Sequence, residues 1–370
     1  MINLNRRQFL GLSGIALTTP TLIAACSNGE EQKLISGYAY TNDNGDRINQ
    51  HGVLIFDSDG NVLSDFDVPH EVHLACFTPD QTSVLVCSRK PGAELLKYSF
   101  HGQLQASFSP LENQHFEGHG IFSEDGRSLY VTASDYEKKE GRLLILNTED
   151  LSLQYDLSSG GIGPHELVWQ SDNIIAIANT GVLTHPDSGR EILNKDNIQS
   201  NISLFDINSK TINQQWQVPI PGLSARHMDT MTDGSLVIGC QYKKEDKRPA
   251  CIAFLSRESG LQFADAHNDK LHWDMKGYTA SIKAIPGTTQ ALITNPRGHL
   301  LSHWDQETQT KLLSTNKIRF NKGLTVHPIQ AKAWISQGAG TLLEMDLVSN
   351  KVKEKKKEIK KNIRWGNHMG

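Results

Sequence analysis

The 370-residue sequence lacks most of the features that mark the common structural and functional classes. It has no run of eighteen apolar residues, which excludes a conventional membrane-spanning helix. Apolar residues with helical spacing between strands are almost absent, which argues against a doubly wound α/β fold. The balance of 37 basic and 41 acidic residues gives a net charge of -4, so no nucleic-acid partner is expected.

The usual catalytic signatures are also missing. The sequence contains no nucleophile elbow, no His-Glu-x-x-His, no phosphate loop, no Cys-x-x-Cys pair and no haem-attachment motif. These absences favour a binding protein over an enzyme.

The first 26 residues predict an export signal. Asn5–Gly11 contains an arginine pair that resembles a twin-arginine signature, and a modestly apolar segment follows it. The segment ends in Leu22–Cys26, which resembles a lipoprotein box. We therefore expect a periplasmic protein that associates with the membrane through a lipid on Cys26. An uncleaved anchor and a plain signal peptide with an incidental cysteine are the alternatives.

Four further cysteines flank two predicted turns, Cys76 with Cys87 and Cys240 with Cys251. Each pair could face across adjacent strands, and an oxidising compartment would permit disulfides there. Two disulfides and four buried thiols both remain open at this point.

A short apolar strand that ends in a small polar residue recurs seven times. The final residues of these strands stand 42, 48, 59, 50, 49 and 41 positions apart. The seven strands are Val53–Asp57, Leu95–Ser99, Leu143–Asn147, Ile202–Asp206, Ile252–Ser256, Leu300–Asp305 and Leu342–Asp346. Three or four short strands in each repeat of this length are typical of propeller blades.

We therefore predict an all-β fold, a single seven-bladed β-propeller over residues 34–369. The first repeat begins near Leu34 without an inner strand, and a surplus strand, Ile363–Met369, follows the last repeat. If the surplus strand completes the first blade, the ring closes and no sheet edge stays unpaired. The lysine-rich segment Lys351–Lys361 would be a solvated outermost strand, or else a patch for anionic lipid or a partner.

Five of the seven predicted inner strands carry a histidine near their start, at one end of the central channel: His73, His119, His165, His227 and His368. Imidazole binds borderline metals and accepts protons near neutral pH. Three roles remain open: hydrogen bonds that fix blade spacing, a metal or ligand site, and proton-transfer catalysis. For a metal site we expect iron, copper or zinc, held by His119, His165 and His227.

Other polar residues lie on loops that should reach the same face. Arg226 and Arg297 are the expected anion contacts, because guanidinium pairs with carboxylate or phosphate through two hydrogen bonds. The remaining candidate ligand contacts are Asp135, Glu166, His185 and Tyr242.

Several segments resemble one known bacterial family. The most specific are Gly160–Leu167 and Thr184–Arg190, and His115–Ser123, Ser224–His227, Gly239–Tyr242 and Asn295–Gly298 add to them. They are similar to the domain-of-unknown-function 1513 family of twin-arginine-exported propellers, from about residue 34 onward. Where that family tends to show Glu-Asn-Asp, this chain has Ala133–Asp135, which retains only the aspartate. The resemblance implies a periplasmic propeller with a part in iron acquisition, alongside imelysin-like partners.

Three functions are therefore weighed. The first is a monomeric binding protein for a metal, a metal chelate or a partner. The second is a hydrolase or lactonase-like enzyme in which Glu166, Asp135 or a histidine is the general base. The third is an interaction scaffold whose loops form the contact surface.

Overall fold

The chain forms short antiparallel strands of the kind that its repeats predict. The structure is a computed structural model that describes residues 32–265, 268–306, 311–338, 340–353 and 357–370. The predicted export signal, with the arginine pair and Cys26, lies outside the described residues. Within the described part, no helix is both long enough and apolar enough to cross a bilayer.

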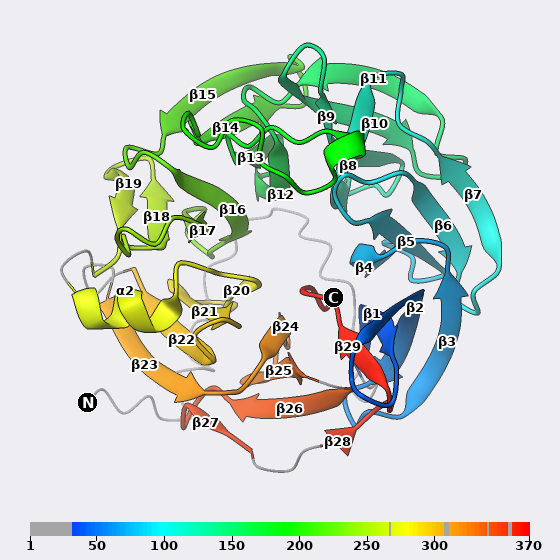
Figure 1. Ribbon diagram of the computed structural model, residues 1–370, viewed down its shortest axis with the longest axis vertical. Helices are drawn as coiled ribbons and strands as arrows, with labels where there is room; N and C mark the ends of the chain where they lie inside the picture. Colours follow the sequence, from blue (N-terminus) through cyan, green and yellow to red (C-terminus); the bar gives the residue numbers. More distant parts are fainter. Residues whose placement is uncertain (1–31, 266–267, 307–310, 339, 354–356) are drawn as a thin grey trace, which may run out of the picture. The chain divides into compact units, whose positions relative to one another are not determined.

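Seven antiparallel sheets stand around a central axis within Lys33–Gly370, which confirms the seven-bladed β-propeller (Figure 1). From the inner to the outer strand, the first blade consists of β29 (Ile363–Trp365), β1 (Lys33–Thr41), β2 (Arg47–Asp57) and β3 (Val62–Val68). In the same order, the second blade consists of β4 (Val72–Phe77), β5 (Ser83–Ser88), β6 (Leu95–Ser99) and β7 (Leu104–Phe108). The third blade consists of β8 (Gln114–Phe122), β9 (Ser128–Asp135), β10 (Glu140–Asn147) and β11 (Leu153–Ser158). The fourth blade consists of β12 (Pro164–Ser171), β13 (Ile174–Asn179), β14 (Asn201–Asp206) and β15 (Thr211–Gln217).

The last three blades repeat this arrangement. The fifth blade consists of β16 (Leu223–Thr230), β17 (Leu236–Tyr242), β18 (Ile252–Ser256) and β19 (Gly260–Phe263). The sixth blade consists of β20 (Ile282–Ala284), β21 (Gln290–Asn295), β22 (Leu300–Asp305) and β23 (Lys311–Lys317). The seventh blade consists of β24 (Asn321–Val326), β25 (Lys332–Gln337), β26 (Thr341–Asp346) and β27 (Lys351–Val352), with β28 (Lys357–Glu358) also paired to β26. The seven strands that the sequence repeats identify are the third strands of their blades.

The C-terminal strand closes the ring. Strand β29 pairs antiparallel with β1, with Trp365 opposite Tyr38, and the two lie side by side in red and blue in Figure 1. Trp365 is fully buried, and its ring lies 5.6 Å from that of Phe56 on β2. The observed strand is shorter than the predicted Ile363–Met369, although Gly366 and Gly370 still form backbone hydrogen bonds with Gly37 and Ile35 of β1. The predicted closure of the first blade is confirmed.

The core lies between the blades, where side chains of one sheet pack against the next. Middle strands such as β5 and β14 are almost wholly buried, and most of their central residues are apolar. Outer strands such as β15 have one face in solvent and alternate between exposed and part-buried residues. This difference explains why the third strands were the easiest to recognise in the sequence.

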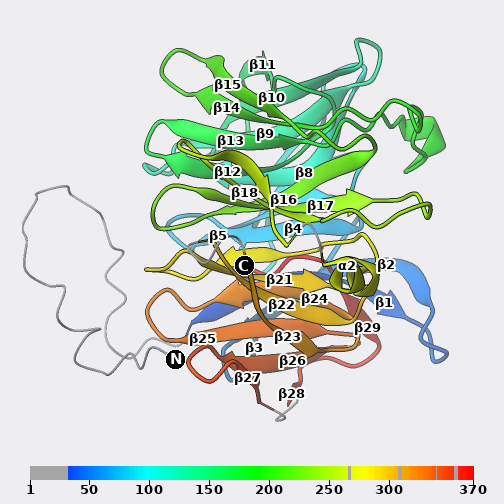
Figure 2. The same cartoon turned by 90° about the vertical axis from the view of Figure 1, so that its left-hand side faces the viewer.

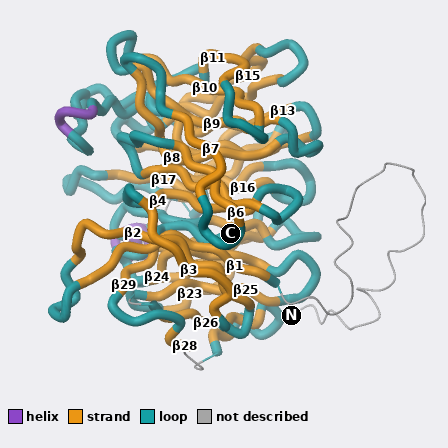
Figure 3. The backbone as a smooth tube through the Cα atoms, turned by 90° about the vertical axis from the view of Figure 1, so that its right-hand side faces the viewer, coloured by secondary structure: helices purple, strands orange, loops and turns teal. Residues whose placement is uncertain are grey.

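Two short helical segments interrupt the strand pattern. A 3-10 helix, η1 (Pro186–Ser188), lies in the long connection between β13 and β14, and the helix α2 (Asp269–Met275) lies between β19 and β20. Figures 2 and 3 show both segments at the same face of the ring. That face also carries the loops that follow the second strand of each blade.

The four cysteines of the propeller are free thiols. Cys76 lies opposite Leu85 and Cys87 opposite Leu74, so this pair is not in register across β4 and β5. The Cys240 amide donates to the Cys251 carbonyl at 2.7 Å, which makes these two cross-strand neighbours without a disulfide. Of the two alternatives, the structure therefore has free thiols, of which three are buried and Cys76 is partly buried.

The lysine-rich segment lies at the outer edge of the seventh blade. Strands β27 and β28 both pair with β26, and residues 354–356 between them lie outside the described part. Lys351, Lys357 and Glu358 are exposed, as a solvated outer strand requires.

Candidate functional site

A β-bulge recurs in the inner strands at the histidine positions. The pairing register between the first and second strands shifts at Val72/Leu74, Phe116/Gly120, Pro164/Leu167 and Ala225/His227. A bulge leaves a residue unpaired and bends the strand, so it redirects the side chains beside it. Here the shifts span His73, His119 and His165, and one ends at His227. Because of the bulges, the side chains of these histidines do not follow the ordinary alternation between the two faces of a strand.

The five predicted histidines meet in the channel. Each is at most 8% exposed, and eight pairs of their rings have centroids 4.7–5.6 Å apart. His73 Nε2 lies 2.9 Å from His119 Nε2. His368, which follows the closing strand, lies against three of the others. Residues almost 300 positions apart in the chain therefore share one buried cluster.

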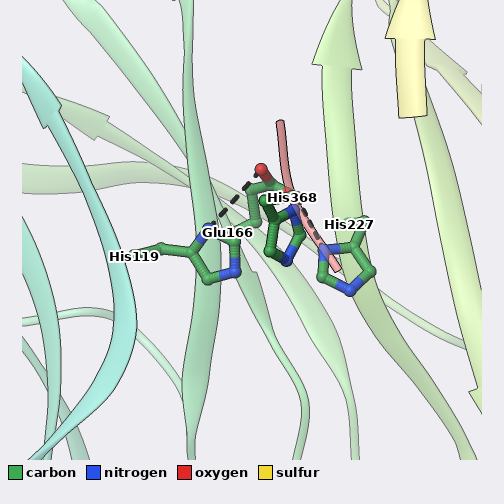
Figure 4. A group of neighbouring side chains, drawn as sticks. All are labelled: His119, Glu166, His227 and His368. Atoms are coloured by element: carbon green, nitrogen blue, oxygen red, sulfur yellow. Dashed lines mark hydrogen bonds and ion pairs between the residues drawn. The ribbon is translucent and has the colours of Figure 1, made fainter. Parts of the chain in front are cut away.

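Glu166 adds a carboxylate to this cluster. Its Oε2 accepts hydrogen bonds from His227 Nδ1 at 2.8 Å and from the Met228 amide at 3.2 Å, and its Oε1 lies 3.6 Å from His119 Nδ1. Figure 4 shows the carboxyl group reaching both His119 and His227, with His368 beside them. The potential ligand atoms of these four residues lie within 4.8 Å of one another, and those of His73, His119 and His165 form a second such group.

Burial favours the neutral form of the histidines in the cluster. Burial lowers the pKa values of His73, His119, His165 and His368 well below 6.5, and it lowers the pKa of His227 to about 3. Burial also raises the pKa of the Glu166 carboxyl. A neutral imidazole has a free lone pair on one nitrogen, which is the form that binds a metal ion.

Second-strand hydroxyl groups and a glycine hold the cluster in place. Thr132 Oγ1 contacts the carbonyl oxygens of His119, at 3.3 Å, and of His165, at 3.0 Å, and so ties two neighbouring blades together. Ser36 Oγ donates to the His368 carbonyl at 2.9 Å. Gly118 has a φ of +106°, and a Cβ there would lie 2.5 Å from the His73 ring. Only glycine therefore allows His73 to lie against the bulge in β8.

A basic cavity lies over the histidines. It has a volume of about 490 Å³, and His73, His165 and His227 are part of its lining. Six blades contribute eight basic side chains to the lining: Arg47, Arg89, Lys90, Arg190, Arg226, Lys243, Arg297 and Lys322. The lining contains no acidic residue.

Two carboxylates beside the cavity balance part of this charge. Glu71 Oε1 pairs with Arg47 Nη1 at 2.8 Å and also with Arg89. Glu117, which is fully buried, has its Oε2 2.6 Å from Lys90 Nζ and accepts a hydrogen bond from Ser134 Oγ. The other five basic residues of the lining form no ion pair with a carboxylate in the described part of the chain.

Arg226 and Arg297, the two predicted anion contacts, line the cavity. Three other candidate ligands, Asp135, His185 and Tyr242, do not. Asp135 accepts from the Lys138 amide at 2.9 Å and so caps the turn after β9. His185 caps η1 through its Nδ1, and the Tyr242 hydroxyl donates to Asp246 at 2.9 Å. The side chains of these last three residues are occupied by local turn and cap contacts, and the structure does not bring them into the site.

The sequence analysis missed part of the basic lining. Arg89 and Lys90 directly follow the second strand of the second blade, in the same place as Lys243 in the fifth and Arg297 in the sixth. The candidate residues named from the sequence after second strands come from the third to sixth blades. The same position in the second blade carries Arg89 and Lys90. Arg47 lies in a hairpin with no counterpart in the other repeats, so the repeats alone do not point to it.

The fold and the site define a seven-bladed propeller with a histidine-filled channel under a basic cavity. The chain belongs to the family described as "Protein of unknown function (DUF1513)", which matches residues 66–370. This match confirms the family resemblance, although it begins at residue 66 rather than near residue 34. No curated protein is significantly similar in sequence to the chain.

Solved structures share the fold. One is described as "Kuenenia stuttgartiensis Hydrazine Synthase", with a TM-score of 0.60 and 13% identity over 82% of this chain and 91% of that chain. Another is described as "Streptogramin B lyase structure", with a TM-score of 0.55 and 11% identity over 86% of each chain. At these identities the likeness concerns the fold alone.

Proposed function

We propose that this protein binds a first-row transition metal ion at the histidine cluster of its channel. The observation that carries the proposal is the convergence of five buried imidazoles and one carboxylate from five blades. Neutral nitrogen donors with a single carboxylate are a ligand set that suits iron, copper, zinc and nickel.

The dimensions of the cluster support a metal site. Two nitrogens on opposite sides of an ion stand about 4.2 Å apart, because a metal–nitrogen bond is about 2.1 Å long. All ligand atoms of each group lie within 4.8 Å of one another, so small side-chain rotations bring them into range. The cavity reaches His73, His165 and His227, so the cluster is in contact with this space.

Hydrogen bonding between blades does not account for the whole cluster. Within the described residues, His165 Nδ1 and His368 Nε2 are buried without a hydrogen-bond partner. Buried polar atoms nearly always have a hydrogen-bond partner, so a buried nitrogen without one indicates that a ligand or ion can bind there. A coordinated ion satisfies such nitrogens directly.

Iron is the metal that we propose first, as part of iron acquisition at the periplasmic side of a membrane, with Cys26 as the lipid-bearing residue. The nitrogen and oxygen donors suit iron, and the four thiols of the propeller, which would favour softer ions, contribute no atom to either group. The acquisition role, an imelysin-like partner and the periplasmic address rest on the family resemblance and on residues 1–26.

Metal analysis of untagged protein tests the proposal. We expect one equivalent of transition metal to be retained or bound by the wild type and to be lost in His119→Ala, because His119 belongs to both ligand groups. His303→Ala is the matched control, since His303 is equally buried and hydrogen-bonded to Asn350 and Gln290 far from the cluster. Wild-type protein that binds no transition metal, or equal binding by wild type and the folded His119→Ala variant, would refute the proposal.

A further inference from the structure

The basic cavity has more positive charge than its surroundings neutralise. Eight basic side chains line it, and Glu71 and Glu117 are the two carboxylates paired with members of the set. A cleft lined by charge of one sign concentrates its field and attracts counter-ions. Six of the seven blades contribute to this charge, so it is a property of the assembled ring.

Two of the arginines have guanidinium groups that are fixed in position and can still donate hydrogen bonds. Arg226 Nε is buried without a hydrogen-bond partner among the described residues. The Arg297 guanidinium lies 4.8 Å from the ring centre of Tyr278, which orients it, and the Tyr278 hydroxyl accepts from Asn367 at 2.9 Å. Stacking leaves the edge of a guanidinium free to form paired hydrogen bonds with an oxyanion.

The positive groups also repel one another. Burial, with Arg226 and Lys90 nearby, lowers the pKa of Lys243 to about 8. Burial, with Arg47 and Arg89 nearby, lowers the pKa of Lys322 to about 7. Arg190 lies in the field of Arg89 and Arg47 and also acts on Lys243, so the basic side chains form one connected region of positive charge. An anion with two or more charged groups neutralises more of this charge than an anion with one.

We propose that the cavity binds a small multivalent oxyanion, a molecule with two or more carboxylate or phosphate groups. The size of the cavity suits a small molecule, and the spread of basic residues over six blades suits several negative groups. The site uses residues other than the metal ligands, so it binds the anion without a metal. If the metal is present, an oxygen of the anion lies next to the histidines; this last step rests on the proposed function.

Calorimetric titration tests this proposal on purified protein freed of metal by an immobilised chelator, at constant ionic strength. The probes are citrate and pyrophosphate, with acetate as the single-charge control. We expect citrate or pyrophosphate to bind at least about tenfold more tightly than acetate, since each additional charged hydrogen bond contributes about that factor. Tighter citrate binding assigns the site to carboxylates, and tighter pyrophosphate binding assigns it to phosphates.

Two exposed arginines provide variants that leave the core intact. Arg190→Ala and Arg297→Ala are each expected to weaken binding about tenfold. Arg127→Ala is the matched control, because Arg127 is 87% exposed and lies outside the cavity. Equal weakening by Arg127→Ala, or no preference of the wild type for multivalent anions over acetate, overturns the proposal.

The same titration of the His119→Ala variant separates the anion site from the metal site. Unchanged anion affinity in that variant supports a site that stands on the arginines and lysines. A loss of anion binding in folded His119→Ala protein overturns it. Failure of the metal analysis alone leaves the anion result unaffected.

Discussion

Replacing Glu166 by glutamine is expected to weaken metal binding without weakening the fold. Glutamine keeps an oxygen that can accept the hydrogen bonds from His227 Nδ1 and the Met228 amide. It removes a negative charge whose burial is unfavourable, as the raised pKa of this carboxyl indicates. The metal-free variant should therefore be at least as stable as the metal-free wild type.

The magnitude follows from the linkage between binding and stability. A metal at 100 times its dissociation constant stabilises the folded state by about 2.7 kcal/mol. If the loss of the carboxylate weakens binding about 100-fold, the same concentration stabilises the variant by only about 0.4 kcal/mol. For a propeller of this size, 1 kcal/mol corresponds to about 1.4 °C in Tm, so the metal-induced rise in Tm should shrink by about 3 °C.

Thermal denaturation of wild type and Glu166→Gln, each with and without metal, provides the measurement. The four melting temperatures separate the effect on the fold from the effect on the metal. An unchanged metal-induced rise in the variant would show that Glu166 is not a ligand. A lower Tm of the metal-free variant would contradict the idea that the buried charge is unfavourable.

Three further results are expected. Citrate affinity should fall from about pH 7 to about pH 9 in calorimetry, because citrate keeps its full charge over this range whereas Lys322 and Lys243, with pKa values of about 7 and 8, lose theirs; constant affinity over this range would contradict their role. Trp365→Ala should lower the free energy of unfolding in urea by about 3–5 kcal/mol, since it empties a buried contact of the closing strand. Cys87 and Cys240 should resist a thiol reagent until the protein unfolds, because both are buried and burial raises their pKa values; rapid labelling of native protein would show that the interior is accessible.

The repeat spacing was sufficient to predict the ring and its histidines. His73, His119 and His165 stand 46 residues apart, and a repeat of one blade returns each to the same place at the channel. The exact register was not predictable, because the bulge in β8 shifts the pairing by two residues whereas those in β4 and β12 shift it by one. A bulge depends on local backbone geometry, which the apolar pattern of a strand does not record.

The loop residues were harder to predict for a related reason. Asp135 and Tyr242 are the last residues of β9 and β17, and His185 lies in a loop, but each forms a contact within its own turn or hairpin. A polar residue in a turn has two uses, to cap the local backbone or to face a ligand, and its position in the chain is the same for both. Arg226 differs because it lies at the register shift within β16, and Arg297 differs because its side chain lines the cavity from the loop after β21.

The position of His368, five residues after Ile363 at the start of the closing strand, has a consequence for the newly made protein. A chain that is still being synthesised has neither a complete first blade nor its fifth imidazole. Residues 363–370 therefore complete the toroid and the cluster of five imidazoles together. On the proposed function, a metal site that uses His368 forms only after these residues are made, so a product truncated before residue 363 would be both open at its seam and without this donor.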